Sequence, residues 1–328
     1  MNTKDAIRYV MTMLMAISST ACGNPEQKFE VKVRDEDGKP LEGIVCKAGF
    51  NLPKKEGTGI SPYIVSGVTA ANGSVEISGE TVFFDTSVRV SGEGYYDSVV
   101  EKLWITGKNG KRWEPWPVRV DLTIKKKKTP QPMYVAKFDA QKWLALPDGG
   151  LGPFGFDLEI GDWVKPLGKG LNADFILEGN RNEPSANLQN PKGSVTLTFT
   201  NELDGIISYD DSGGSTHVGP TDAPKNGYVN RWEFKNWKSD GAVLGGISRD
   251  FRNEAYVFRV RTRVDSNGKI VEARYGKIDG RIRGWLIDKA PGIMFTYYFT
   301  DTPNERGLEW DMKNNLIAND KIKAPRRP

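Results

Sequence analysis

The sequence has very little of the chemistry on which most enzyme classes depend. Among its 328 residues there are two cysteines, Cys22 and Cys46, and one histidine, His217. A catalytic zinc site would therefore need mostly carboxylate ligands, which is unusual. The chain has neither a Gly-x-Ser-x-Gly motif nor a phosphate-binding P-loop. These absences argue against the common motif-defined hydrolases and nucleotide-binding enzymes, and we expect no metal and no cofactor.

Clustered charge and long apolar runs are also missing. The net charge is +4 with both signs interspersed, whereas nucleic-acid-binding proteins present a basic face, so nucleic acid is not an expected partner. After residue 22 no stretch is long and apolar enough to cross a bilayer. The four lysines at 125–128 and the prolines that follow predict a solvated linker over 125–132.

The first 22 residues have the order of an export signal. Lys4 and Arg8 precede a short apolar run at 9–17, and small residues at 18–21 lead to Cys22. Basic, then apolar, then small is the pattern of a secretory signal peptide, and the apolar part is too short to span a membrane. We therefore predict a signal peptide over 1–21.

The end of this segment resembles the lipobox of bacterial lipoproteins. Residues 19–22 are Ser-Thr-Ala-Cys, and in that family the cysteine is lipidated and becomes the mature N-terminus. The resemblance implies a lipid anchor at Cys22, a membrane partner and a cell-envelope location, followed by a tether over 22–27. Gly23 is not the aspartate that retains many such proteins on the inner membrane, so the outer membrane is expected. Ordinary cleavage after Ala21, with Cys22 uninvolved, is the alternative.

The remainder of the chain is patterned as β-structure. There are 36 glycines and 19 prolines, which suits many short strands joined by turns. Phe29, Val31 and Val33 alternate with charged residues, as in a half-buried strand. We predict a second strand over 41–47, an exposed loop over 50–61, and hairpins at the Asn-Gly turns of 72–73 and 267–268.

This order of parts resembles the carboxypeptidase regulatory-like domain. The residues that carry the resemblance are Asp-x-Asp-Gly-Lys-Pro-Leu-x-Gly at 35–43, the Asn-Gly turn at 72–73 and Ser-Gly-x-Gly-Tyr at 91–95. The resemblance covers 28–124 and implies a transthyretin-like or immunoglobulin-like β-sandwich. That family is a non-catalytic accessory module, so it implies a fold but no reaction.

Residues 133–318 form the larger predicted domain, and 319–328 a tail. Strands are expected over 195–199, 228–237, 255–264, 269–278 and 293–300, with almost no helical periodicity. The predicted fold class is therefore all-β, with two β-sandwich domains, the second larger and jelly-roll-like.

Carboxylates are the one catalytic option that this composition leaves. Glycosidases need only two of them, facing each other across the scissile bond. The candidates for catalysis are Asp157, Glu159 and Asp162, with Asp174, Glu309 and Asp311 as further members of the group. Asp157 and Glu159 would share one face of a strand, which any amphipathic strand also shows.

Carbohydrate binding is a more natural use of a β-sandwich in the envelope. Flat aromatic rings stack on sugars, and the chain has nine tryptophans. The candidates for binding are Trp113, Trp116, Trp232 and Trp237, although most tryptophans in proteins are largely buried in cores. We expect a non-enzymatic binding or structural component of the envelope, with a glycan or a protein as its ligand. The alternative is a polysaccharide hydrolase that uses the carboxylates of the second domain.

Overall fold

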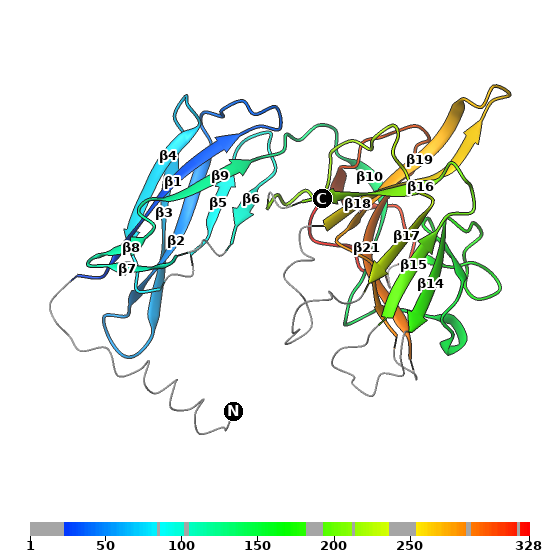
Figure 1. Cartoon of the computed structure of the whole chain (residues 1–328), viewed down its shortest axis with the longest axis horizontal. Helices are drawn as coiled ribbons and strands as arrows, with labels where there is room; N and C mark the ends of the chain where they lie inside the picture. The colour runs from blue at the N-terminus through cyan, green and yellow to red at the C-terminus, as the bar shows by residue number, and fades with distance from the viewer. Residues whose placement is uncertain are drawn as a thin grey trace, which may run out of the picture. The chain divides into compact units, whose positions relative to one another are not determined.

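A computed structural model of the chain describes residues 23–83, 86–101, 105–181, 193–211, 214–235, 254–286, 290–319 and 322–328. Nearly all of its regular structure is β, as predicted (Figure 1). These residues divide into two compact units. The first takes in residues 23–34, Gly38–Ser91 and Val100–Leu122, and the second takes in Asp35–Asp37, Gly92–Val99 and the chain from Thr123 on.

Two sheets make up the first unit. Its strands and the strand at its boundary are β1 (Glu26–Arg34), β2 (Val45–Pro53), β3 (Ile60–Val68), β4 (Ser74–Glu80), β5 (Val88–Ser91), β6 (Ser98–Val100), β7 (Gly107–Asn109), β8 (Arg112–Glu114) and β9 (Val118–Thr123). One sheet has the order β4-β1-β8-β7, and β9 also pairs with β1. In the other, β2 lies between β3 and β5.

The core of the first unit lies where these sheets face each other. Phe29 of β1 and Phe50 of β2 are both buried, with their ring centroids 6.0 Å apart. Cys46 of β2 is also fully buried, and it acts as a small apolar side chain. Burial raises the pKa of the Cys46 thiol to about 11. Cys46 is therefore part of the packing.

The predicted bounds of the second strand, 41–47, were wrong. The strand begins at Val45 and continues through Phe50 to Pro53, so the predicted loop of 50–61 is mostly the β2–β3 hairpin. Gly43 explains the late start, because its φ of +78° breaks the extended chain. Alternating burial of Cys46, Ala48 and Phe50 explains the extension.

The predicted hairpin at Asn72-Gly73 was also wrong, although the turn itself forms. Gly73 has a φ of +73° and donates its N–H to the carbonyl of Ala70 at 2.8 Å. However, β3 pairs with β2 and β4 pairs with β1, so the turn connects two sheets. A Cβ on Gly67 would lie 2.6 Å from Val75 Cγ2, so the two strands stack face to face at this point.

The second unit has a larger and a smaller sheet. Its elements are β10 (Gln131–Phe138), β11 (Leu144–Ala145), a 3₁₀ turn η1 (Pro147–Gly149), β12 (Phe154–Asp157), β13 (Asp162–Trp163), β14 (Phe175–Arg181), β15 (Gly193–Thr198), β16 (Gly205–Asp210), β17 (Arg231–Lys235), β18 (Glu254–Val264), β19 (Ile270–Asp279), β20 (Arg283–Trp285), β21 (Gly292–Thr300) and β22 (Trp310–Asn315). The larger sheet has the order β16-β18-β19-β21-β10-β22, with β11 and β20 also on β21. The smaller has the order β13-β12-β14-β15-β17.

Aromatic side chains fill the space between these two sheets. Phe175 of the smaller sheet meets Phe258 of the larger edge to face, with centroids 4.9 Å apart. Phe156 meets Tyr297 in the same way at 6.0 Å. Such T-shaped contacts place ring edges on ring faces and are favourable beyond their burial. The second unit is thus a β-sandwich, and its jelly-roll topology stays a prediction.

The hairpin predicted at Asn267-Gly268 is confirmed. Gly268 has a φ of +76°, and the turn joins β18 to β19, which pair antiparallel. Within the described ranges, no helix is long and apolar enough to cross a membrane.

Candidate functional site

Arg261 occupies an irregular point in β18. The register of β18 with β19 shifts between Val260 and Arg263, and Arg261 has a φ of +56°. A side chain other than glycine rarely adopts this backbone conformation, and it persists where the surroundings fix it. The bulge turns the Arg261 guanidinium toward carboxylates from other parts of the second unit.

Three of the carboxylates singled out in the sequence lie around this guanidinium. Asp174 accepts from Arg261 Nε at 2.7 Å and from Arg261 Nη2 at 2.9 Å, which is a bidentate Arg–carboxylate pair. Glu159 accepts from Nη1 of Arg261 and also pairs with Arg274. Asp157 Oδ1 lies 3.7 Å from Nη2. The fold thus brings together residues that are far apart from Arg261 in the chain.

Asp157 and Asp204 also hold backbone amides. Asp157 Oδ2 accepts from the N–H groups of Leu171 at 2.8 Å and Asn172 at 2.9 Å, which fixes the loop that returns to β14. Asp204 accepts from the N–H groups of Arg261 at 2.9 Å and Thr262 at 3.0 Å. The two bonds to Asp204 hold the backbone of the bulge at Arg261 and Thr262.

Burial and ion pairing oppose each other in this network. Burial raises the pKa of Asp174, and the Arg261 guanidinium acts in the opposite direction. Although burial alone would lower it, the pKa of Arg261 is raised because Asp174 and Glu159 surround it. A hydrogen-bonded network of this kind is suited to holding loops in place, and its carboxylates are already engaged as acceptors.

An open hollow of about 360 Å³ lies beside Arg261. It is lined by Leu171, Asn172, Ala173, Asp174, Thr200, Asn201, Asp204 and Arg261. Asn201 donates to the carbonyl of Thr262 at 2.6 Å, so this amide also serves the local structure. The lining is polar and contains no aromatic ring on which a sugar could stack.

The other candidate carboxylates have other partners, although Asp162 lies opposite Asp157 in the β12–β13 pair. Asp162 accepts from the N–H groups of Trp163 at 2.8 Å and Lys169 at 3.0 Å. Glu309 is buried and accepts from the Tyr96 hydroxyl at 2.9 Å. Asp311 closes a turn by accepting from the N–H of Asn314 at 2.8 Å.

Three of the four tryptophans predicted to bind a glycan, Trp113, Trp116 and Trp232, are partly buried. Trp113 donates its indole N–H to the carbonyl of Thr81 at 2.8 Å, and the Arg112 guanidinium lies 4.9 Å from the centre of the Trp116 ring. Trp232 packs against the core of the second unit. Trp237, like the lipidation candidate Cys22, lies outside the described residues.

Sequence reasoning missed a buried polar cluster in the second unit. Lys277 of β19 is fully buried, and its Nζ lies 3.2 Å from His217 Nδ1 and 4.7 Å from the centre of the Tyr298 ring. The His217 ring is also buried and stacks on Tyr96 at 4.9 Å. In the sequence His217 follows a Gly- and Ser-rich run, which gives no sign of this burial. A signal was available, because the period-two alternation of β19 places Lys277 on the same face as the apolar Ala273 and Tyr275.

Comparisons with known proteins add little. No protein-family model and no curated protein matches the chain. Among solved structures, the chain is similar to 3-chlorocatechol 1,2-dioxygenase from Rhodococcus opacus 1CP, with 10% identity and a TM-score of 0.25. The match covers 33% of this chain and 63% of the dioxygenase chain. A likeness at this level carries no inference about fold or function.

Proposed function

We propose that the protein is an exported, lipid-anchored component of the bacterial cell envelope with a non-enzymatic binding or structural role. The anchor is on Cys22, the location is the outer membrane, and the ligand is a glycan or another envelope protein. The first unit is a carboxypeptidase regulatory-like accessory module. The observation that carries the proposal is the order of residues 1–22: basic, apolar, small, then cysteine.

The fold after this segment supports an accessory role. Regular β-structure begins at Glu26, four residues after the proposed anchor. Two compact β-rich units follow. Rigid sandwiches of this kind present loops and sheet faces for recognition, and their fold alone implies no reaction.

The contacts of the carboxylates support the non-enzymatic role over the hydrolase. A glycosidase acid and its partner must be free to meet substrate, about 5–10 Å apart. Asp157 and Asp174 instead use their oxygens on backbone amides and on Arg261. Asp162 is engaged with the amides of its own loop. We therefore retain the binding role.

Lipid labelling tests the anchor. The full chain is expressed in a Gram-negative host grown with radiolabelled palmitate, beside the variants Cys22→Ser and Cys46→Ala. We expect label in the wild type and in Cys46→Ala, since Cys46 is buried in the sandwich. We expect none in Cys22→Ser. Equal labelling of all three, or of none, would contradict the proposal.

Ligand binding is tested with the tryptophans as reporters. The purified protein is titrated with a panel of bacterial and host polysaccharides while tryptophan emission is recorded. A saturable change with one polysaccharide, lost in Trp116→Ala, supports a glycan ligand. Release of reducing sugar in the same samples would instead establish the hydrolase.

A further inference from the structure

The chain is hydrogen-bonded to the first unit from Asn24 on. Asn24 donates its side-chain N–H to Glu80 Oε2 at 3.3 Å, and Pro25 accepts from the N–H of Thr81 at 2.8 Å. β1 begins at Glu26. Of the tether predicted over 22–27, only the residues before Asn24 lie outside these bonds. An anchor on Cys22 would therefore keep this end of the sandwich close to the membrane surface.

Two turns lie at the end of the first unit where β1 begins (Figure 1). The turn between β7 and β8 carries Lys111, whose carbonyl accepts from the N–H of Glu26 at 2.8 Å. The turn between β2 and β3 carries Lys54 and Lys55, both exposed. It is tied to the same end because the N–H of Asn51 donates to Thr81 Oγ1 at 3.2 Å.

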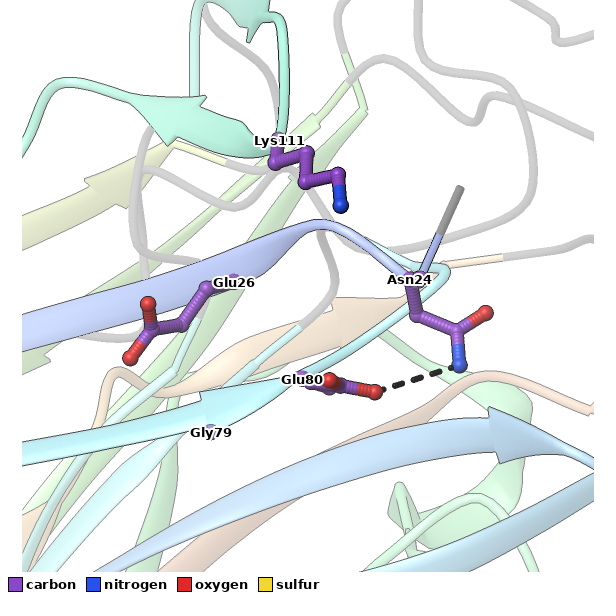
Figure 2. Close-up of a pocket in the computed structure, with 6 residues that line it drawn as sticks. Asn24, Glu26, Gly79, Glu80 and Lys111 are labelled. Carbon is purple, nitrogen blue, oxygen red and sulfur yellow. Dashed lines mark hydrogen bonds between the residues drawn. The ribbon is translucent and has the colours of Figure 1, made fainter. Parts of the chain in front are cut away.

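An open hollow of about 410 Å³ lies between the entering chain and these elements. It is lined by Gly23, Asn24, Glu26, Gly79, Glu80 and Lys111. Figure 2 shows Asn24 reaching the Glu80 carboxylate, with the Lys111 side chain pointing toward the segment between Asn24 and Glu26. Polar groups thus surround the first residue after the proposed anchor.

Apolar side chains are exposed at the same end. Phe83 follows β4 and is 45% exposed, and Ile60 at the start of β3 is 44% exposed. Glu26, Glu56 and Glu80 are acidic residues among those described at this end. Of these, Glu80 is hydrogen-bonded to Asn24.

We propose that this end of the first unit, formed by Lys54, Lys55, Ile60, Phe83 and Lys111, rests on the anionic headgroups of the membrane that holds the Cys22 anchor. The inference rests on the proposed function, because it needs the anchor. With Asn24 fixed on the sandwich, acyl chains on Cys22 bring these residues to the lipid surface. Lysines near anionic headgroups and exposed apolar side chains at the interface both favour such contact.

Depth-dependent quenching tests the contact. The full chain, in a Cys46→Ala background, carries an environment-sensitive dye on Thr58→Cys at the β2–β3 turn or on Ala71→Cys at the opposite end of the unit. The acylated protein is placed in vesicles of phosphatidylethanolamine and phosphatidylglycerol that contain headgroup spin-labelled lipid. We expect quenching of the dye at position 58 and little at position 71. Equal quenching at both positions would overturn the proposal.

A charge-reversal pair tests the role of the lysines. The double variant Lys54→Glu with Lys55→Glu is expected to lose the quenching at position 58. Its dye should be quenched no more on these vesicles than on vesicles of phosphatidylcholine alone. The matched control, Lys47→Glu with Arg89→Glu, reverses two exposed charges on β2 and β5 and should keep it. If both pairs lose or both keep the signal, the proposal fails. Palmitate label is measured on the same samples. If the label is present and the quenching pattern is absent, the membrane contact fails while the anchor stands; if the label is absent, the anchor itself fails.

Discussion

Lys277 Nζ lies 3.2 Å from His217 Nδ1 in the interior of the second unit, with both side chains buried. His217 Nε2 lies 3.2 Å from the carbonyl of Pro220, so this nitrogen carries the proton and Nδ1 accepts from the lysine. Lys125 and the acidic groups of Asp211, Asp279 and Glu309 also act on Lys277. This pair makes the stability of the second unit depend on pH in two separate ranges.

The first prediction concerns Lys277 at alkaline pH. Burial lowers the pKa of Lys277 from 10.5 to about 7. Between these values the unfolded chain binds a proton that the folded chain does not, so stability rises with pH by up to about 1.4 kcal/mol per unit. Lys277→Met should flatten this rise, as measured by urea unfolding from pH 7 to pH 10. Lys269→Met, at an exposed turn position, should keep it. An unchanged slope in Lys277→Met would contradict the account.

The second prediction concerns His217 at acid pH. Burial lowers the pKa of His217 to about 2, from 6.5, and the nearby Lys277 charge acts in the same direction. Below pH 6.5 the unfolded chain therefore binds a proton that the folded chain does not. The free energy of unfolding then falls by up to about 1.4 kcal/mol for each pH unit by which the pH is lowered. His217→Gln should lose this part of the acid dependence in urea unfolding at pH 4 to pH 7. A wild-type protein whose stability does not change over that range would show that His217 is not buried.

The third prediction concerns Arg261. Arg261→Ala should destabilise the second unit by about 3 kcal/mol or more, because it leaves the buried Asp174 without its partner. Arg263→Ala is the matched control on the same strand. Its side chain is 72% exposed and pairs with Glu272, so its loss should change stability by no more than about 1 kcal/mol. Similar losses in the two variants, measured by urea unfolding, would mean that the network contributes nothing beyond a surface ion pair.

The fourth prediction concerns the packing of the first unit. Gly67→Ala should lower the stability of that unit by about 1–3 kcal/mol, because the added methyl meets Val75 Cγ2 at 2.6 Å. Gly49→Ala places the same methyl on the adjacent strand, where nothing lies within 4 Å. It should be nearly neutral in the same thermal unfolding experiment. If Gly67→Ala is also neutral, β3 and β4 are not stacked at this point.

Local patterns predicted much of the fold. The alternation of Phe29, Val31 and Val33 gave a buried strand face, and Asn267-Gly268 gave a hairpin, because both depend on residues close in the chain. The turn at Asn72-Gly73 misled for the same reason. A turn type reports a local reversal and not which sheet the next strand joins, and here the close approach of Gly67 to Val75 decides that.

The candidate site was less accessible to sequence reasoning. The carboxylates Asp157, Glu159 and Asp174 were singled out, but their partner Arg261 is about 90–100 residues away along the chain, so only the fold reveals the pair. Lys277 was missed although it shares a strand face with the buried Ala273 and Tyr275, because a lysine is rarely fully buried. Loops of the second unit cover its outward face and bring His217 onto it.

The mass of the mature N-terminal peptide tests the central claim most directly. The full chain is expressed in a Gram-negative host, purified from its membranes, digested, and analysed by mass spectrometry. The account predicts a peptide that begins at Cys22 and carries the mass of a diacylglyceryl group and a further acyl chain. A peptide that begins at an unmodified Cys22, or one that retains residues 1–21, would contradict it.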